Sequence, residues 1–130
     1  MTLKQLSEQL AADRHKKPVP PTHRKFWAGT DPAEQSCACC GRHLNGVSVF
    51  IDGSIPALGG MWGLMCQACW TQHGIKIDGR ATLGTGRGQK YRLEVFNGLV
   101  RWWKVESKDE LARRLRLDAE ISASAEASAP

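Results

Sequence analysis

Four of the five cysteines form two pairs with two residues between the thiols, Cys37 with Cys40 and Cys66 with Cys69. A C-x-x-C pair points two sulfurs the same way from a short turn, so two pairs supply the four thiolates of one tetrahedral zinc site. Four protein ligands leave no open coordination position, which is typical of a structural metal. The sequence therefore predicts Zn²⁺ as the cofactor of a protein that is not an enzyme.

Other interpretations of the cysteines stay open at this point. They could be free buried thiols, or they could hold an iron–sulfur cluster, which also takes four thiolates. His43 or His73 could replace one cysteine as a ligand. The remaining thiol, Cys39, is adjacent to Cys40 and so lacks the two-residue spacing, and its role is left open.

The elements that must position these ligands follow from local patterns. Gly41 directly after the second cysteine is typical of a tight knuckle. Alternating apolar residues over 47–51 predict a strand, and Asp52-Gly53 is a turn signal. Residues 61–65 can return as a second strand, and 66–74 form a short helix closed by glycine. Knuckle, hairpin and helix in this order predict a small α+β zinc-binding domain of the treble-clef type.

The most distinct secondary-structure signal follows the cysteine module. Residues 91–96 and 99–105 flank Asn97-Gly98, the favoured two-residue turn of a β-hairpin. This turn predicts four cross-strand pairs: Val95 with Val100, Glu94 with Arg101, Leu93 with Trp102, and Arg92 with Trp103. Trp102 then lies on the apolar face, in the core, and Trp103 on the other face. Ser107 and Glu110 form a capping box, which predicts a helix to about Leu117.

Composition and charge limit the class of protein. Hydrophobic residues make up 42% of the 130 residues, and 18 Lys and Arg against 13 Asp and Glu give a net charge of +5, which is compatible with a polyanionic partner. The sequence shows no membrane span and no secretory signal, so a cytoplasmic protein is expected. The expected segments are an amphipathic helix (1–12), a basic Pro-rich arm (13–30), the zinc-finger domain with its hairpin and C-terminal helix (31–118), and a disordered tail (119–130).

Residues 37–91 resemble small zinc-finger proteins of bacteriophages and mobile elements. Those proteins join a C-x-x-C-G knuckle to W-x-x-M-C-x-x-C and then to L-G-T-G-x-G-Q-x-Y, and the chain has each segment, the last at 83–91. It departs at Trp70, where His is frequent, and at 75–82, which is an insertion. The resemblance implies a treble-clef fold and a bacterial host cell, and no established activity.

Residues 52–70 also resemble the metal finger of HNH endonucleases. Asp52, Pro56 and the glycines that follow match D-H-x-x-P-x-x-x-G-G in type and nearly in spacing. The histidine that would activate water is replaced by Gly53, and Trp70 follows the last cysteine. A general base is required for that reaction, so the resemblance implies a shared scaffold and disfavours a nuclease.

The basic residues indicate where a polyanion would bind. The glycine-rich loop at 84–90 could cradle phosphate, although it lacks the Walker A pattern. Trp103 could stack on a base or anchor a protein partner. The residues predicted to bind nucleic acid, DNA or RNA, are Arg24, Lys25, Arg80, Arg87, Lys90, Arg92, Arg101 and Trp103.

The alternative partner is a host protein. In that case the chain is an inhibitor or adaptor, and Trp103, Phe96 and Leu99 form an exposed apolar patch. Trp70, next to the last cysteine, is expected to shield the metal from solvent. The sequence leaves the oligomeric state undetermined.

Overall fold

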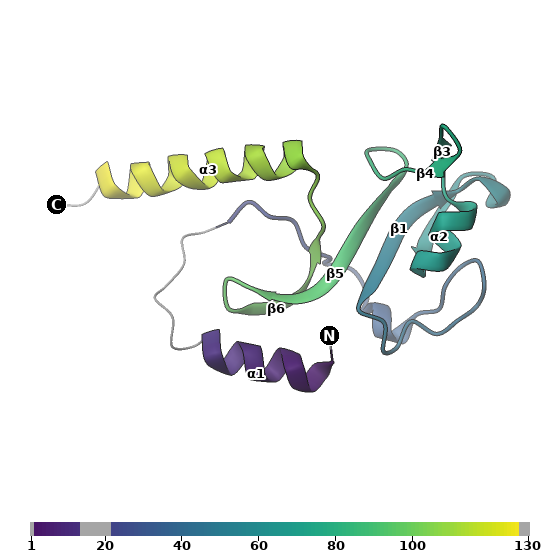
Figure 1. Ribbon diagram of the computed structural model, residues 1–130, viewed down its shortest axis with the longest axis horizontal. Helices are drawn as coiled ribbons and strands as arrows, with labels where there is room; N and C mark the ends of the chain where they lie inside the picture. The colour runs from purple at the N-terminus through teal and green to yellow at the C-terminus, as the bar shows by residue number, and fades with distance from the viewer. Residues whose placement is uncertain (1, 14–21, 128–130) are drawn as a thin grey trace.

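A computed structural model describes residues 2–13 and 22–127 of the chain (Figure 1). Its elements confirm the predicted α+β class in outline, with three α-helices around a curled antiparallel sheet. In chain order the elements are α1 (Leu3–Asp13), η1 (Pro32–Glu34), β1 (Val49–Ile55), η2 (Pro56–Leu58), β2 (Met61–Met65), α2 (Gln67–His73), β3 (Lys76–Ile77), β4 (Arg80–Ala81), β5 (Gly88–Phe96), β6 (Leu99–Lys104) and α3 (Lys108–Ala127).

The main sheet has the strand order β2-β1-β5-β6, and β3 and β4 form a separate small hairpin. The first half of β5 pairs with β1, and its second half pairs with β6. One long strand thus joins the cysteine-bearing half of the protein to the C-terminal half. Figure 1 shows α1 and α3 on opposite sides of the β5–β6 hairpin, while α2 lies beside β1.

The predicted β5–β6 hairpin is confirmed in its register. All four predicted cross-strand pairs are present, and the two turn residues have positive φ, 51° at Asn97 and 73° at Gly98. Two central residues of positive φ define a type I′ turn, whose twist matches that of the flanking strands. The local turn chemistry therefore determines the pairing.

The predicted turn at Asp52-Gly53 is wrong, because both residues lie inside β1. The chain turns instead at η2 and the following Gly59 and Gly60, which both have positive φ. Gly53 serves another purpose, since a Cβ atom there would lie 2.7 Å from Cζ3 of Trp70. Its missing side chain makes room for the indole ring.

The described part of the predicted arm, from Thr22, runs along the edge strand β6. The Trp27 amide donates to the Trp102 carbonyl at 2.8 Å, and the Lys104 amide donates to the Lys25 carbonyl at 2.9 Å. This segment covers part of an edge that would otherwise expose unpaired backbone groups. The rest of the arm, residues 14–21, lies outside the described residues.

The terminal helices differ from their predicted bounds. The N-terminal helix spans Leu3–Asp13 in place of 1–12. The C-terminal helix continues past Leu117 to Ala127, so the predicted disordered tail is helical up to that residue. Alanine and glutamate are good helix formers, which accounts for the extension. Residues 128–130 lie outside the described residues.

The core joins aliphatic and aromatic side chains on both faces of the sheet. Phe50 stacks on Tyr91 with ring centroids 5.2 Å apart, and Trp27 and Trp102 meet Phe50 edge-on. Trp102 packs against this cluster, as the alternation along the hairpin predicts. Fully buried core residues on the cysteine side include Leu44, Ile51 and Met65.

Candidate metal centre and basic groove

The four paired cysteines converge on one point. The Sγ atoms of Cys37, Cys40, Cys66 and Cys69 all lie within 4.8 Å of one another, and those of Cys40 and Cys66 are 4.0 Å apart. A tetrahedral zinc ion with bonds of about 2.3 Å separates its sulfurs by about 3.8 Å. The four cysteines are therefore positioned for metal ligation.

Two small structures hold these ligands in place. Gly41, with a φ of 75°, closes the knuckle after the first pair, and its amide donates to the Cys37 carbonyl at 2.9 Å. The second pair opens α2, with Cys66 at its N-cap and Cys69 in its first turn. The Ala38 amide donates to the Leu64 carbonyl at 2.9 Å, which fastens the knuckle to β2.

Backbone amides already stabilise negative charge on the sulfurs. The amides of Cys66 and Arg42 donate to the Sγ atoms of Cys37 and Cys40, both at 3.4 Å. Burial raises the pKa of Cys37, but backbone hydrogen bonds from Cys40, Cys66 and Cys39 outweigh it and bring that pKa to about 6. Burial and the neighbouring cysteines raise the pKa of the Cys69 thiol. A bound cation would stabilise all four thiolates.

The alternative ligands do not join this cluster. Among the residues that the structure describes, only the four paired cysteines form a group that could hold a metal ion, and His43 and His73 are exposed outside it. Cys39 is half-buried, and burial together with the charges of Cys37 and Cys40 raises its pKa. Its thiol thus resembles a small apolar side chain.

Trp70 is almost fully buried, at 3% exposure, directly after the last cysteine. Its ring packs directly against three glycines. A Cβ atom at Gly53, Gly74 or Gly88 would lie within 2.8 Å of an indole atom. The ring thus ties α2 to the middle of β1 and the start of β5. That Trp70 shields the metal from solvent stays a prediction.

A basic groove lies between the glycine-rich loop and the first turns of α3. It has a volume of about 560 Å³, and Lys25, Arg87 and Lys90 from the predicted nucleic-acid set line it. Lys104 and Arg113 line it too, and sequence reasoning missed both because the fold alone brings them next to Lys25 and the loop. The structure therefore brings cations from four separate segments into one hollow.

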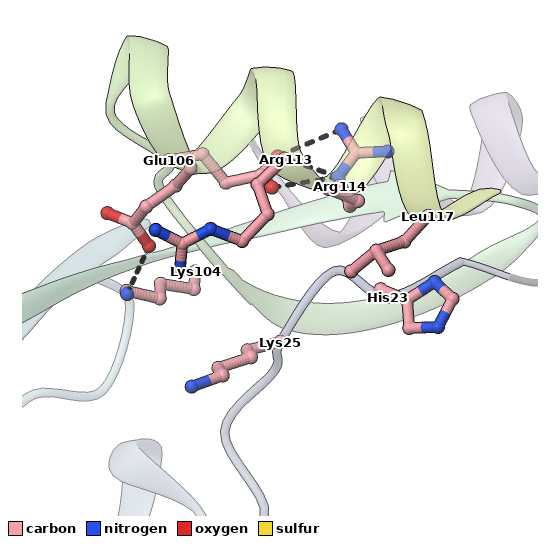
Figure 2. Close-up of a pocket in the computed structure, with 8 residues that line it drawn as sticks. His23, Lys25, Lys104, Glu106, Arg113, Arg114 and Leu117 are labelled. Carbon is pink, nitrogen blue, oxygen red and sulfur yellow. Dashed lines mark hydrogen bonds and ion pairs between the residues drawn. The ribbon is translucent and has the colours of Figure 1, made fainter. Parts of the chain in front are cut away.

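Two further hollows adjoin this groove. One of about 270 Å³, drawn in Figure 2, shares Lys25, Lys104 and Arg113 with it and extends along α3 to Leu117. The other, of about 380 Å³, adjoins at Lys90 and reaches Arg80 and α2. Arg80 thus joins the cationic surface, through a different hollow from Lys25.

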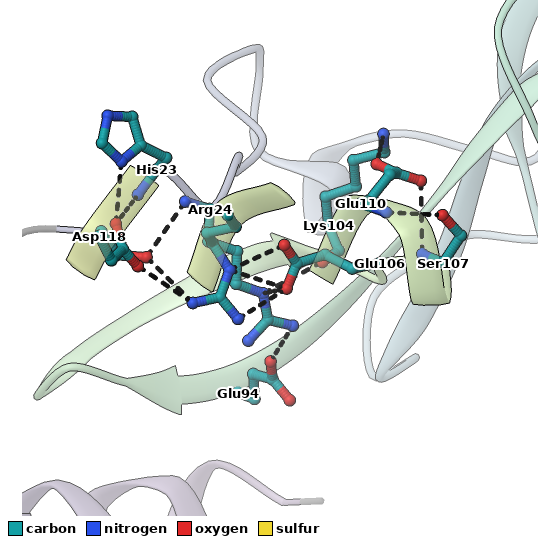
Figure 3. Close-up of polar contacts among 10 residues, drawn as sticks. His23, Arg24, Glu94, Lys104, Glu106, Ser107, Glu110 and Asp118 are labelled. Atoms are coloured by element: carbon teal, nitrogen blue, oxygen red, sulfur yellow. Dashed lines mark hydrogen bonds and ion pairs between the residues drawn. The ribbon is translucent and has the colours of Figure 1, made fainter. Parts of the chain in front are cut away.

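Several charges beside the groove are already neutralised by partners (Figure 3). Arg24 pairs with Glu94, lies 3.7 Å from Glu106 and stacks over Phe96 at 4.7 Å, so its charge is used inside the protein. Lys104 pairs with Glu110. Arg87 donates to the carbonyl of Leu83 at 2.9 Å and to that of Thr82, and so braces its own loop.

The remaining predicted residues lie on the outer surface or in the interior. Arg92 is exposed on β5, and Arg101 stacks over Phe26 at 4.0 Å. Trp103 is only 1% exposed, so the prediction that it offers a stacking surface is wrong. Phe26 and Phe96 meet the Trp103 ring edge-on and cover this face of the hairpin.

The apolar patch predicted from Trp103, Phe96 and Leu99 is also wrong, because only Leu99 is exposed. One group of exposed apolar side chains lies at the turn between β1 and β2. Met61 is 68% and Trp62 49% exposed, next to the exposed Leu58. Their signal in the sequence is an apolar M-W pair that directly follows two glycines.

The chain matches no protein-family model, no curated protein and no solved structure. None of the helices in the described ranges 2–13 and 22–127 has the length and apolar character that a bilayer crossing needs.

Proposed function

We propose that the protein is a non-enzymatic zinc-binding module of the treble-clef type. The supporting observation is the convergence of four thiols from a knuckle and from a helix start, separated by a β-hairpin. Four thiolates would fill the coordination sphere of zinc and leave no position for a substrate. The packing of Trp70 on Gly53 adds support, since no histidine side chain fits at the position where HNH nucleases carry one.

We propose that this module binds nucleic acid through the basic groove. The observation that carries the proposal is that Lys25, Lys90 and Arg113 line one groove and have no ion-pair partner among the described residues. Unpaired cations in a concave surface attract polyanions, and lysine and arginine contacts to phosphate carry no sequence information. A phage or mobile-element origin and a cytoplasmic location in the bacterial host belong to the same proposal and rest on the family resemblance.

Salt dependence tests this function directly. Fluorescence anisotropy with labelled DNA and RNA should show binding that weakens steeply between about 50 and 200 mM salt, because released counterions drive the association. Arg113→Ala should weaken binding several-fold. Arg116→Ala is the matched control, since Arg116 is exposed on the same helix and lines none of the hollows described above. Absence of binding at low salt would remove the proposal.

A second candidate function is an adaptor for a host protein, and the exposed Leu58, Met61 and Trp62 favour it. An apolar contact of this kind should hardly respond to salt. Affinity purification from host cells with nuclease treatment separates the two functions. A partner that survives nuclease but is lost with Trp62→Ser would support the adaptor.

A further inference from the structure

We infer that the groove takes a single-stranded polynucleotide, held by its phosphodiester backbone, and this inference rests on the nucleic-acid-binding function proposed above. The first reason is the position of the cations. Lys90 and Lys104 are half-buried on β5 and β6, where they line the same groove. Lys25 and the loop from Leu83 supply further lining, and the segment that leads into α3 and its first turns supply Val105, Glu106, Ser107, Glu110 and Arg113.

The second reason is the size of the hollows. The groove and the hollow at α2, with volumes of about 560 and 380 Å³, lie within the range of small-ligand sites, which runs from about 300 to 1,000 Å³, and the hollow along α3 lies just below it at about 270 Å³. One or a few nucleotides fit such a space. Duplex DNA is a broad, stiff rod with a persistence length of about 50 nm, so its phosphates reach exposed cations such as Arg113 and miss half-buried ones. A flexible single strand follows the hollows.

The third reason is that neighbouring hollows share lining residues. The hollow at α2 shares Leu83 and Lys90 with the groove, and the groove shares Lys25, Lys104 and Arg113 with the hollow along α3. Cations therefore recur along a path longer than any single hollow. A chain of phosphates can use them in succession, whereas a free mononucleotide can use only one or two.

The lining of the groove also bears on whether bases are recognised. Two aromatic side chains line these three hollows: Trp70, which is buried, and His23, whose exposed imidazole lies 2.9 Å from the Asp118 carboxylate. Many single-strand binders gain affinity by stacking successive bases on a series of exposed rings, and the lining of these hollows offers only the His23 ring. Affinity should therefore depend on strand length and salt, and hardly on base sequence.

Glu110 competes with the ligand for one cation. Its carboxylate pairs with Lys104, and it also accepts from the Ser107 amide in the capping box of α3. A phosphate that reaches Lys104 must displace this carboxylate. Glu110→Gln removes the competing charge, and glutamine still serves in a capping box, so this variant should bind single strands several-fold more tightly.

The experiment compares one sequence in two forms. Fluorescence anisotropy at about 50 mM salt measures a labelled single strand of about 12 nucleotides, within the usual range of site sizes, against the same sequence as a blunt duplex, in DNA and in RNA. We expect the single strand to bind at least about tenfold more tightly than the duplex.

Lys90→Ala should reduce the slope of log K against log salt by about 1. Arg116→Ala is the control, because Arg116 is exposed and lines none of the three hollows.

The outcomes separate the inference from the proposed function. Equal or tighter binding of the duplex would overturn the single-strand inference and leave nucleic-acid binding intact. Unchanged affinity in both Lys90→Ala and Glu110→Gln would also overturn it, because the strand would then bypass the half-buried cations. Binding of neither form would remove the proposed function itself. Circular dichroism of each variant confirms that the fold is retained.

Discussion

Arg114 is one of the residues that attach α3 to the rest of the protein. Its guanidinium donates to both carboxylate oxygens of Glu106 at 2.8 to 3.0 Å, lies 3.3 Å from Asp118 and stacks over Phe96 at 5.2 Å. We expect Arg114→Ala to lower the free energy of unfolding by about 2 to 3 kcal/mol, because Glu106 is left half-buried without this partner. Urea denaturation followed by circular dichroism measures the loss.

Arg114→Lys provides the graded control. A lysine keeps the charge but lacks the planar fork that meets two carboxylate oxygens, so its loss should be intermediate. Arg116→Ala, on the exposed side of the same helix, should change the free energy of unfolding by less than about 0.5 kcal/mol. Equal stability of wild type and Arg114→Ala would show that α3 is held by other contacts.

Gly53 is the second residue with a specific structural demand. Its position beneath Trp70 leaves a Cβ atom 2.7 Å from the ring and 3.2 Å from the carbonyl oxygen of Arg87. Gly53→Ala should therefore cost about 1 to 3 kcal/mol by overpacking. In a double-mutant cycle with Trp70→Leu the cost should shrink, and a strictly additive cycle would contradict this account.

At the scale of elements, the attachment of α3 depends on pH. Burial raises the pKa of Asp118, but hydrogen bonds from His23 and Arg114 outweigh it and leave that pKa below its ordinary value. Burial likewise raises the pKa of Glu110, while Lys104 and Ser107 lower it to a net decrease. Carboxylates with lowered pKa values stabilise the fold above their unfolded-state pKa, and this contribution is lost as the pH falls through the folded-state values.

We therefore expect α3 to lose stability as the pH falls below about 4. The urea midpoint measured from pH 7 to pH 3 should decline in wild type. Asp118→Asn should start lower at pH 7 and decline less, because it lacks one of the two titrating groups. Parallel curves for the two proteins would show that Asp118 does not contribute to this dependence.

Elements whose structure depends on neighbouring residues could be predicted from the sequence. The register of β5 and β6 follows from Asn97-Gly98, and the convergence of the four thiols follows from the spacing of the two cysteine pairs. The capping box at Ser107 and Glu110 is also present, with the Glu110 amide 3.2 Å from the serine hydroxyl. In the hairpin and the helix a turn or a cap fixes the geometry within a few residues, and in the cysteine cluster the shared need for four ligands joins two pairs that are 26 positions apart.

Features that need a distant partner could not be predicted. The alternation along β6 predicts that the Trp103 side chain points away from the core. In the structure Phe26, from the segment that pairs with β6, and Phe96 cover its ring. In the sequence Arg24 has no acidic neighbour and is predicted to be a free cation. In the structure Glu94, 70 positions further along the chain, pairs with it. The groove is likewise assembled from segments that only the tertiary fold brings together. Sequence patterns identified the cations and not their partners.

At the scale of the whole molecule, the metal should determine whether the cysteine half folds. This half is short and rich in glycine, and a structural zinc ion contributes on the order of 10 kcal/mol in comparable modules. We expect the purified protein to carry one zinc ion per chain, seen by native mass spectrometry. A chelator should abolish the cooperative unfolding transition of this half.

Two cysteine variants make the test specific. Cys40→Ser removes a ligand and should lose the metal, whereas Cys39→Ser, next to it in the chain, should retain the metal because Cys39 lies outside the cluster. Metal loss in Cys39→Ser with retention in Cys40→Ser would reverse the ligand assignment. A compact apo protein would show that the thiols fold without an ion.

The packing of the Trp70 indole links the metal centre to the groove. The ring follows a cysteine of the cluster and rests on Gly88, where β5 begins, two residues before Lys90. Stripping the ion would release α2, unseat the indole and loosen the strand that presents this lysine. The affinity for nucleic acid that we propose should therefore fall when a chelator removes the ion, although none of the four cysteines lines the groove.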